Sequence, residues 1–408
     1  MTCKGPEARK SFWRGTHRTI SPAETLERFG RHAAGLGITR LANVTGLDYL
    51  RVPVFMAVRP NSRSLSVSQG KGLDEASARV SAFMESAELA HAENIEWPRR
   101  TASYDSLRSQ EAVADPRLLS RIAGNRFRAE RKIPWIEGDE LVGGGKIWVP
   151  FDCVNTDYTI PASFDCGFVR DSNGLASGNN RPEAICCGLY EVIERDAENL
   201  WRLRSGGARV AFRLLLASVT DPDCRALIDR LAMNDMKVAV WDITSDIGIA
   251  SFLCRLREAP HNRRSAHGAF WGSGCHLNRG VALSRAITEA VQSRLTYIAG
   301  SRDDLLEENY GKLHDGTLFD LVQDLWEEQA GGRRFDDISS TDNAAFEDDL
   351  EEIFRRLAGV GLREVVAVDL TSERFEIPVL RIIVPGLEGS SEHRGIVLGR
   401  RARALARS

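Results

Sequence analysis

The sequence predicts a fold that mixes helices and strands, of the α+β or mixed α/β class. Long stretches with helical spacing of apolar residues alternate with short runs rich in Val, Ile and Phe along most of the chain. Clusters of Gly, Asn and Pro separate these stretches and mark turns. A hydrophobic content of 43% and a charged content of 27% are ordinary for a globular protein. The 408 residues suffice for a large core.

Helices are expected where a capping residue comes before a run of helical spacing. Ser21 followed by Pro22 marks such a start, and Gly35 and Gly37 mark the end of the same helix. Pro182 marks another start. Helices are therefore predicted at residues 23–35, 74–93, 182–204, 221–234, 281–299, 316–329 and 343–358.

Strands are expected in the short runs of β-branched and aromatic residues. They are predicted at residues 38–44, 51–59, 133–137, 146–149, 160–163, 209–213, 236–242, 248–255, 364–371 and 378–384. Residues 60–72 are expected to form a loop or strand, and residues 98–130 a mixture of loop and short helix. Two glycine-containing segments, 171–180 and 271–277, are predicted to be loops that lead into the helices after them. Glycines let the backbone come close to a ligand, and free backbone amides at a helix start favour the binding of phosphate oxygens.

Charge and cysteine usage exclude several classes of protein. A net charge of −3 gives no sign of nucleic-acid binding, so no nucleic-acid partner is expected. None of the eight cysteines belongs to a C-x-x-C pair, so the common zinc and thioredoxin-like patterns do not occur. The first residues lack the apolar segment of a signal peptide, and no run of about 18 apolar residues occurs. A cytoplasmic protein without membrane contact is expected.

Three of the predicted helices carry acidic residues on one face. Ser81, Glu85 and Glu88 lie at i, i+4 and i+7, so they share a face of the first. Glu289 and Gln292 belong to a polar stripe of the third, flanked by small residues that would let a ligand approach. If these faces converge, the carboxylates repel one another unless cations lie between them. Magnesium ions with a bound triphosphate would satisfy such a cluster.

The second acidic helix allows two interpretations. Glu183, Glu191 and Glu194 share one face, and Arg195 lies at its edge. An amphipathic helix with this pattern commonly turns its acids to solvent, so an ordinary surface face is one interpretation. The other is that this face joins the two acidic faces above in one site. The helix taken alone does not decide between them.

Several long motifs, in order and correctly spaced, closely resemble the YcaO family. The likeness extends from about residue 10 to residue 395. The motifs are the run 282–304, the run 183–197, the helix with Ser81, Glu85 and Glu88 after Lys71-Gly72, the segment 242–248 and the segment 382–388.

The resemblance implies a YcaO-type fold, in which β-sheets packed with long helices surround a cleft for ATP and magnesium. It also implies an ATP-dependent enzyme that acts on peptide backbone amides. Members of this family hold ATP and Mg²⁺ with glutamates, and no Walker A sequence occurs here. The amide oxygen is phosphorylated, and a nucleophile then replaces it. A Cys, Ser or Thr side chain gives an azoline, and sulfide gives a thioamide.

The family's site residues carry over by position. Glu85, Glu88, Glu191 and Glu194 match the magnesium-binding glutamates. The positions that match nucleotide-site or metal-site residues are Ser81, Asn179, Glu183, Arg195, Glu289 and Gln292. Lys10, Arg14 and Thr16 match the N-terminal phosphate-contacting segment, or else belong to an ordinary basic arm. Arg294 and Arg302 follow the third motif without an assigned contact, although a charge on the apolar side of a helix should reach a partner or a ligand. His276 is either a structural loop residue or a neighbour of the site.

The motifs taken together most resemble those of family members that are paired with a TfuA partner and are associated with thioamide formation. The tail, rich in arginine, lacks the proline repeat of many azoline-forming members. We therefore expect thioamide formation on a peptide or protein substrate, with a TfuA-like sulfur-delivery partner and a homodimeric enzyme. A cyclodehydratase and a non-catalytic nucleotide-binding scaffold are the alternatives. The expected organisation is an N-terminal segment at 1–59 that completes the nucleotide site, a catalytic core at 60–390 and a basic tail at 391–408.

Overall fold

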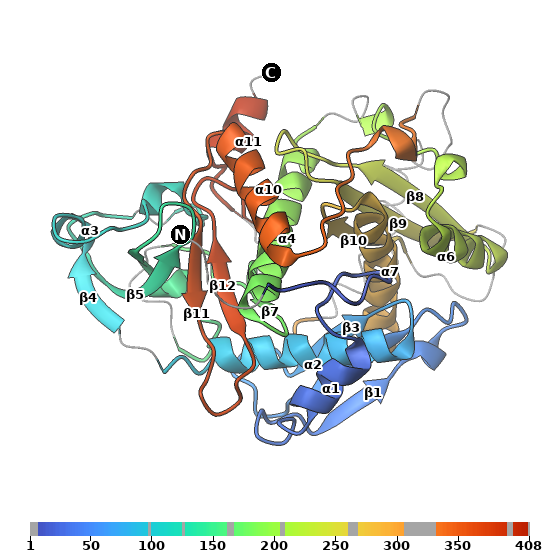
Figure 1. The fold of residues 1–408 in the computed structure, drawn as a ribbon, viewed down its shortest axis with the longest axis horizontal. Coiled ribbons are helices and arrows are strands. Elements are labelled where there is room, and N and C mark those ends of the chain that lie inside the picture. Colours follow the sequence, from blue (N-terminus) through green and yellow to red (C-terminus); the bar gives the residue numbers. More distant parts are fainter. Residues whose placement is uncertain are drawn as a thin grey trace.

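The strands form three antiparallel sheets (Figure 1), and the predicted mixed fold class is confirmed. The structure is a computed structural model that describes residues 7–96, 99–124, 127–160, 167–204, 209–259, 268–305, 332–389 and 395–406. The first sheet has the order β1-β2-β3, with bounds Arg40–Asn43, Val54–Val58 and Val67–Lys71. The second has the order β10-β9-β8, with bounds Phe270–Cys275, Ser251–Glu258 and Met236–Asp242.

The third sheet has six strands in the order β4-β5-β11-β12-β7, with β6 beside β5. Their bounds are Arg99–Ser103 for β4, Lys132–Glu140 for β5, Lys146–Pro150 for β6, Leu175–Ser177 for β7, Val366–Asp369 for β11 and Val379–Ile383 for β12. The predicted boundary between residues 59 and 60 falls between β2 and β3, which pair along their full length.

The helices pack on these sheets. Their bounds are Pro22–Gly30 for α1, Glu75–Ala92 for α2, Tyr104–Arg108 for α3, Arg181–Arg202 for α4, Pro222–Met233 for α6, Arg279–Ala299 for α7, Phe346–Gly359 for α10 and Arg400–Leu405 for α11. Each of the three acidic helices begins at a side-chain cap, since Asp74, Asn180 and Asn278 accept a hydrogen bond from the amide three residues later. Within the described ranges no helix has both the length and the apolar character needed to cross a membrane.

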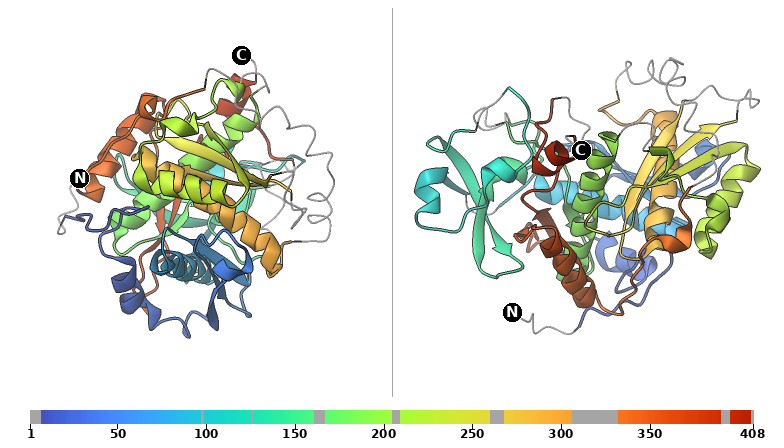
Figure 2. Two further views of the ribbon diagram at one scale, coloured as in Figure 1. Left: turned by 90° about the vertical axis from the view of Figure 1, so that its right-hand side faces the viewer. Right: turned by 90° about the horizontal axis from the view of Figure 1, so that it is seen from above.

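The three acidic helices meet because each covers a different sheet. α2 packs on β2 and β3, α4 on β7 and β12, and α7 on β9 and β10. Figure 1 shows α4 standing between the six-stranded sheet and β10, with α2 passing below both. The view from above in Figure 2 shows these two sheets on opposite sides of α4. The apolar cores therefore lie between helix and sheet, and the helix faces turned toward one another are free to carry polar groups.

The predicted loop at 271–277 was wrong, and the predicted loop at 171–180 is interrupted by a short strand. Most of segment 271–277 is the strand β10, and segment 171–180 contains β7. Glycine suggested a turn at 271–277, but the glycines of β10 serve close packing instead. A Cβ atom at Gly274 would fall against the carbonyl oxygen of Ala282 in α7, and one at Gly272 would fall against the amide of Ala290. Strand and helix can approach this closely only because these positions carry no side chain.

Other elements also differ from prediction. Residues 209–213 form no strand, and Arg213 makes only an isolated bridge to Trp241. Strand β4, within the stretch expected to be loop and short helix, was missed because its sequence Arg-Arg-Thr-Ala-Ser has little apolar content. The expected helix 316–329 and nearly all of the expected strand 160–163 lie outside the described residues.

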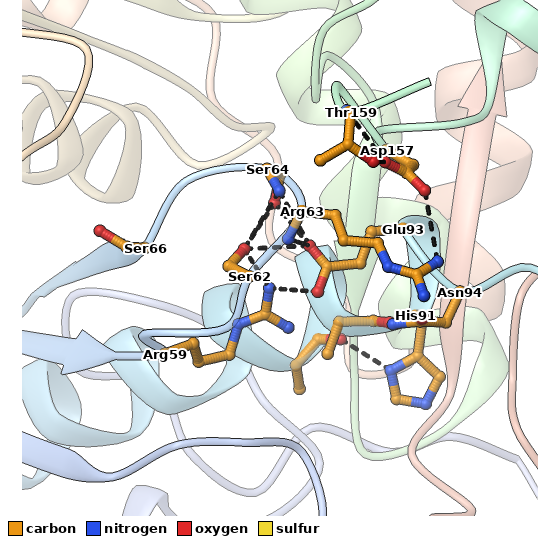
Figure 3. Close-up of polar contacts among 12 residues, drawn as sticks. Arg59, Ser62, Arg63, Ser64, Ser66, His91, Glu93, Asn94, Asp157 and Thr159 are labelled. Carbon is orange, nitrogen blue, oxygen red and sulfur yellow. Dashed lines mark hydrogen bonds and ion pairs between the residues drawn. The ribbon is translucent and has the colours of Figure 1, made fainter.

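A buried cluster of polar groups fixes the loop after β2 against the end of α2 (Figure 3). The carboxylate of Glu93 accepts hydrogen bonds from the Arg59 guanidinium at 2.7 Å and from the hydroxyls of Ser62 and Ser64 at 3.0 and 2.9 Å. Arg59 and Glu93 are both buried, so the pair is shielded from water. This loop carries Leu65 to the wall of the cavity described below.

Two buried or nearly buried arginines tie distant segments together through ion pairs. Arg294 of α7 is buried and donates to Glu258 at 2.8 Å and to Asp48 at 3.3 Å, so the expectation that it reaches a partner is confirmed. In the basic tail, Arg401 of α11 donates to the buried Asp196 of α4 at 3.0 Å. Unpaired charges at these depths would be costly.

Close packing at Gly274 gives a test of the fold. We expect Gly274→Ala to lower the free energy of unfolding by about 1–3 kcal/mol, because the added methyl group overpacks β10 against α7. Gly359→Ala is the matched control, since a Cβ there meets nothing within 4 Å, and its effect should be neutral or slightly stabilising. Urea unfolding of the three proteins measures both effects. Equal stability of Gly274→Ala and the parent protein would contradict this packing.

Candidate functional site

α2, α4 and α7 enclose a cavity of about 480 Å³ together with residues 7–21, here named the N-terminal arm. Every predicted site residue except Lys10 lines this cavity. The lining residues among them are Arg14, Thr16, Ser81, Glu85, Glu88, Asn179, Glu183, Glu191, Glu194, Arg195, Glu289 and Gln292. Thus the three acidic faces converge, and the interpretation of the α4 face as ordinary solvated surface was wrong.

The two α2 glutamates sit in surroundings that disfavour their charge. Burial raises the pKa of Glu88 to about 8, and the nearby carboxylates of Glu85 and Glu191 add to this. Glu88 accepts hydrogen bonds from the Ser177 amide and hydroxyl at 2.8 and 2.6 Å, which oppose the rise. Burial also raises the pKa of Glu85, although Lys71 counteracts it. Both groups would ionise more readily beside a bound cation.

The α4 glutamates show the same tendency. Burial raises the pKa of Glu191 to about 7, against the attraction of Arg195. Burial likewise raises the pKa of Glu194, which receives a hydrogen bond from the Ser273 hydroxyl at 3.0 Å. Arg195 lies 3.6 Å from the Glu194 carboxylate and 3.8 Å from that of Glu289, so it bridges α4 and α7.

Glu289 of α7 behaves differently because it has a direct partner. The Lys71 ammonium group lies 2.6 Å from its carboxylate. Burial alone would raise the pKa of Glu289, but Lys71 and Arg195 outweigh it and lower the pKa to about 2. Glu289 is therefore ionised at neutral pH while Glu88 retains its proton. One cavity thus holds carboxylates with widely separated proton affinities.

Glu183 and Asn179 join α4 to the N-terminal arm. The Thr19 amide and hydroxyl donate to one Glu183 oxygen at 3.0 and 2.7 Å. The Asn179 side-chain amide donates to the other oxygen at 3.1 Å. Glu183 is almost completely buried, and these bonds hold the arm over the cavity.

The donor set of the cavity suits a hard divalent cation. Within the described ranges, three buried carboxylate or amide oxygen atoms of lining residues lack a hydrogen-bond partner: Glu194 Oε2, Asn179 Oδ1 and Gln292 Oε1. Carboxylate and amide oxygens are the ligands that Mg²⁺ takes in proteins. No three acidic, His or Cys side chains of the described chain lie close enough together to hold an ion by themselves. Mg²⁺ commonly completes its coordination with substrate phosphates and water, so this spacing fits a metal–nucleotide complex.

Lys10 lies away from the cavity. Its ammonium group forms a buried ion pair with Asp349 of α10 at 2.7 Å. His276 also lies outside the cavity lining and packs between the rings of His17 and Tyr190. Arg302, left without an assigned contact above, lines the cavity.

Three basic residues of the cavity were missing from the predicted site. Arg18, Lys71 and Arg285 line it beside the glutamates. Lys71 belongs to a quoted motif, and its ion pair with Glu289 reflects the apposition of β3 and α7. Arg285 lies four residues before Glu289 on one predicted helix, so helical spacing could have pointed to it, whereas Arg18 has no such spacing and only the fold reveals it.

Comparisons with known proteins identify the family of this chain. The family described as YcaO cyclodehydratase, ATP- and Mg²⁺-binding, matches residues 69–388. A protein in the tfuA 3′ region of Rhizobium leguminosarum bv. trifolii is 37% identical over 391 residues, which cover 94% of this chain and 92% of the relative. The expectation of ATP and Mg²⁺ as cofactors is confirmed by the family description.

Solved structures share the fold. A YcaO protein of Methanopyrus kandleri, bound with AMPPCP and Mg²⁺, is 25% identical with a TM-score of 0.73, and the match covers 93% of this chain and 94% of that one. A heterocyclase in complex with substrate and cofactor is 22% identical with a TM-score of 0.80. That match covers 98% of this chain and 56% of the heterocyclase. The chain belongs to the YcaO family of ATP-dependent enzymes.

Proposed function

We propose that this chain binds Mg²⁺ and ATP in the cavity and activates a backbone amide of a peptide or protein, which sulfide then converts to a thioamide. The observation that carries the proposal is the meeting of acidic faces from α2, α4 and α7 in one cavity beside Lys71 and Arg195. The sequence motifs that place these residues span most of the chain.

Amide activation explains the need for ATP. An amide carbon is a poor electrophile because resonance shares the nitrogen lone pair with the carbonyl. Transfer of the γ-phosphoryl group to the amide oxygen makes that oxygen a leaving group. Hydrosulfide then adds to the carbon and phosphate departs, so one oxygen is exchanged for sulfur and ATP yields ADP and phosphate.

The residues have distinct roles in this proposal. Glu85, Glu88, Glu191 and Glu194 would hold Mg²⁺, which neutralises phosphate charge when bound. Ser81, Asn179 and Gln292 would bind the nucleotide and its metal, together with Arg14 and Thr16 of the arm. Arg195 and Lys71 fix the Glu289 carboxylate and supply positive charge beside the phosphates.

The choice of sulfide rests on the relatives. The Rhizobium relative is described by its position in the tfuA 3′ region, which supports a TfuA-like partner that delivers sulfur. A peptide or protein supplies the amide, and a homodimer remains an expectation from the family resemblance. The heterocyclase neighbour and the family's cyclodehydratase description favour one second candidate, azoline formation from Cys, Ser or Thr.

Removal of a predicted metal ligand tests the site. We expect Glu191→Gln to weaken Mg-ATP binding by at least about tenfold, because a neutral amide is a poorer Mg²⁺ ligand than a carboxylate. Glu351→Gln is the control, because Glu351 is exposed on α10 and does not line the cavity. Calorimetric titration with Mg-ATP measures both. Unchanged affinity of Glu191→Gln would refute the assignment.

The two candidate reactions change peptide mass in opposite directions. Both reactions begin from the same phosphorylated amide. Thioamide formation replaces oxygen with sulfur and adds about 16 Da for each amide, whereas azoline formation loses water and removes about 18 Da. Co-expression with a TfuA-like partner and candidate peptides, followed by intact mass spectrometry, separates them. Mg-ATP binding with neither phosphate release nor a mass change on any peptide would favour a non-catalytic, nucleotide-binding role.

The raised pKa values predict how pH affects the ligand-free protein. In the folded state the pKa of Glu88 is about 8 and that of Glu191 about 7, above the ordinary 4.5. Between the ordinary pKa of 4.5 and these raised values, the folded protein retains protons that the unfolded chain has lost, so rising pH favours unfolding. We expect the Tm to fall as the pH rises from about 5 to about 8. Mg-ATP should offset the loss.

Comparison with Glu88→Gln isolates this effect. The variant lacks one titrating group, so its Tm should depend less steeply on pH than that of the parent protein. Burial lowers the pKa of His17 to about 4, which has the opposite effect on stability, but His17 is present in both proteins. Identical slopes from a thermal melt series would contradict the protonated state of Glu88.

A further inference from the structure

The N-terminal arm forms one wall of the cavity, although it contains no long helix or strand. Arg14, Gly15, Thr16 and Arg18 of the arm all line the cavity. The Arg14 side chain is 57% exposed, and its acidic neighbours Asp223 and Asp74 lie 3.5 and 3.8 Å away. Such loose contacts leave it available to a phosphate group. The shape of this wall therefore depends on how the rest of the arm is held.

One attachment of the arm is the buried ion pair between Lys10 and Asp349. Both side chains are 1% exposed, and their charged atoms are 2.7 Å apart. The hydroxyl of Tyr190 in α4 donates to Asp349 at 3.2 Å, and the side-chain amide of Asn343 donates to its other oxygen at 3.1 Å. These contacts satisfy the Asp349 carboxylate without water. Loss of either charge would leave the other buried and unpaired.

Backbone hydrogen bonds reinforce this attachment. The Lys10 amide donates to the Ala344 carbonyl at 2.9 Å, and the Phe346 amide donates to the Ala8 carbonyl at 3.1 Å. The arm thus lies along the segment that enters α10. α10 itself contributes no residue to the cavity lining, so its effect on the cavity is exerted through the arm.

A row of rings provides a second attachment. The Trp13 and His17 ring centroids are 4.6 Å apart, those of His17 and His276 are 4.7 Å apart, and those of His276 and Tyr190 are 4.4 Å apart. Burial lowers the pKa of His17 and of His276, so both rings are neutral at physiological pH and pack as apolar groups. The ion pair and the ring row both end at Tyr190, the residue before Glu191.

The far end of the arm is held independently. Thr19 binds Glu183 of α4, as described above, and the turn at Gly15 packs against Leu73. Gly15 has a φ of +66°, and a Cβ there would lie 2.5 Å from Leu73 Cδ1. The segment that lines the cavity is therefore stretched between fixed points at Lys10 and Thr19.

We propose that Lys10, Asp349 and Tyr190 are positioning residues for the nucleotide site, which hold the arm so that Arg14, Thr16 and Arg18 face the bound phosphates. In this role Lys10 acts through Asp349 and does not contact the nucleotide. The inference rests on the proposed function, because it assumes that the cavity binds Mg-ATP. Because the arm is already ordered, it loses less conformational entropy when nucleotide binds.

Paired variants test this role by Mg-ATP calorimetry. We expect Asp349→Asn to raise the Kd by about tenfold, because the arm loses its anchor 2.7 Å from Lys10. Lys10→Met should have a similar effect, and the double variant should be little worse than either, since both changes break one contact. Asp349→Glu should restore much of the affinity. Glu352→Gln is the control on the same helix, because Glu352 pairs with Arg355 and Arg356 instead.

A direct phosphate contact by Lys10 predicts a different pattern. In that case Lys10→Met weakens Mg-ATP binding far more than Asp349→Asn, and the two effects add. This result would overturn the positioning role. Tyr190→Phe is a milder variant that keeps the ring and removes the hydroxyl, and it covers the possibility that Asp349→Asn fails to fold.

Limited trypsin digestion tests the anchor without nucleotide. Cleavage after Arg14 and Arg18 should be about tenfold faster in Asp349→Asn than in the parent protein or Glu352→Gln, because an unanchored arm opens more often. Equal cleavage rates would refute the anchor. If the parent protein binds no Mg-ATP yet Asp349→Asn exposes the arm, the proposed function fails while the anchor stands.

Discussion

The cost of burying several like charges together governs this structure. Carboxylates from three helices share one cavity, and at this depth their mutual repulsion is strong. The ligand-free protein limits that repulsion in two ways. Lys71 and Arg195 neutralise Glu289, whereas Glu88 retains a proton at neutral pH. The site is therefore ready to exchange protons for metal ions, because a cation between the glutamates would take the place of the proton on Glu88.

Packing of each helix on its own sheet supplies the force that holds these charges together. A glycine lets strand and helix approach closely in two of the three cases. Gly70 of β3 faces the backbone of Ala82 in α2, and Gly274 of β10 faces that of Ala282 in α7. The third helix, α4, is approached by Gly178, whose Cβ would lie 2.6 Å from the Ala184 amide. Small residues on the helices also allow this close approach. Tight apolar packing on one face of each helix thus offsets the repulsion among the carboxylates on the other face.

The parts of the site that could be predicted from sequence are those with a local pattern. Glu85 and Glu88 share a helical face by spacing alone, and the acidic helices are long and capped. Periodicity does not tell which face of a helix is buried, so the spacing of the α4 acids also fitted a solvated surface. The glycines of β10 suggested a loop because turns and close strand packing use the same residue. Lys10 pairs with a residue 339 positions later, which no local pattern encodes.

The order in which the chain is made has a consequence for the N-terminal arm. The arm leaves the ribosome well before its partners Glu183 and Asp349, which follow much later in the chain. Contacts of such sequence separation form late, because loop closure must come before them. A nascent chain that lacks α10 has no partner for Lys10, so one of the two fixed points of the arm is missing. We therefore expect the cavity to be completed only after α10 has been synthesised, so that chains without α10 bind nucleotide weakly.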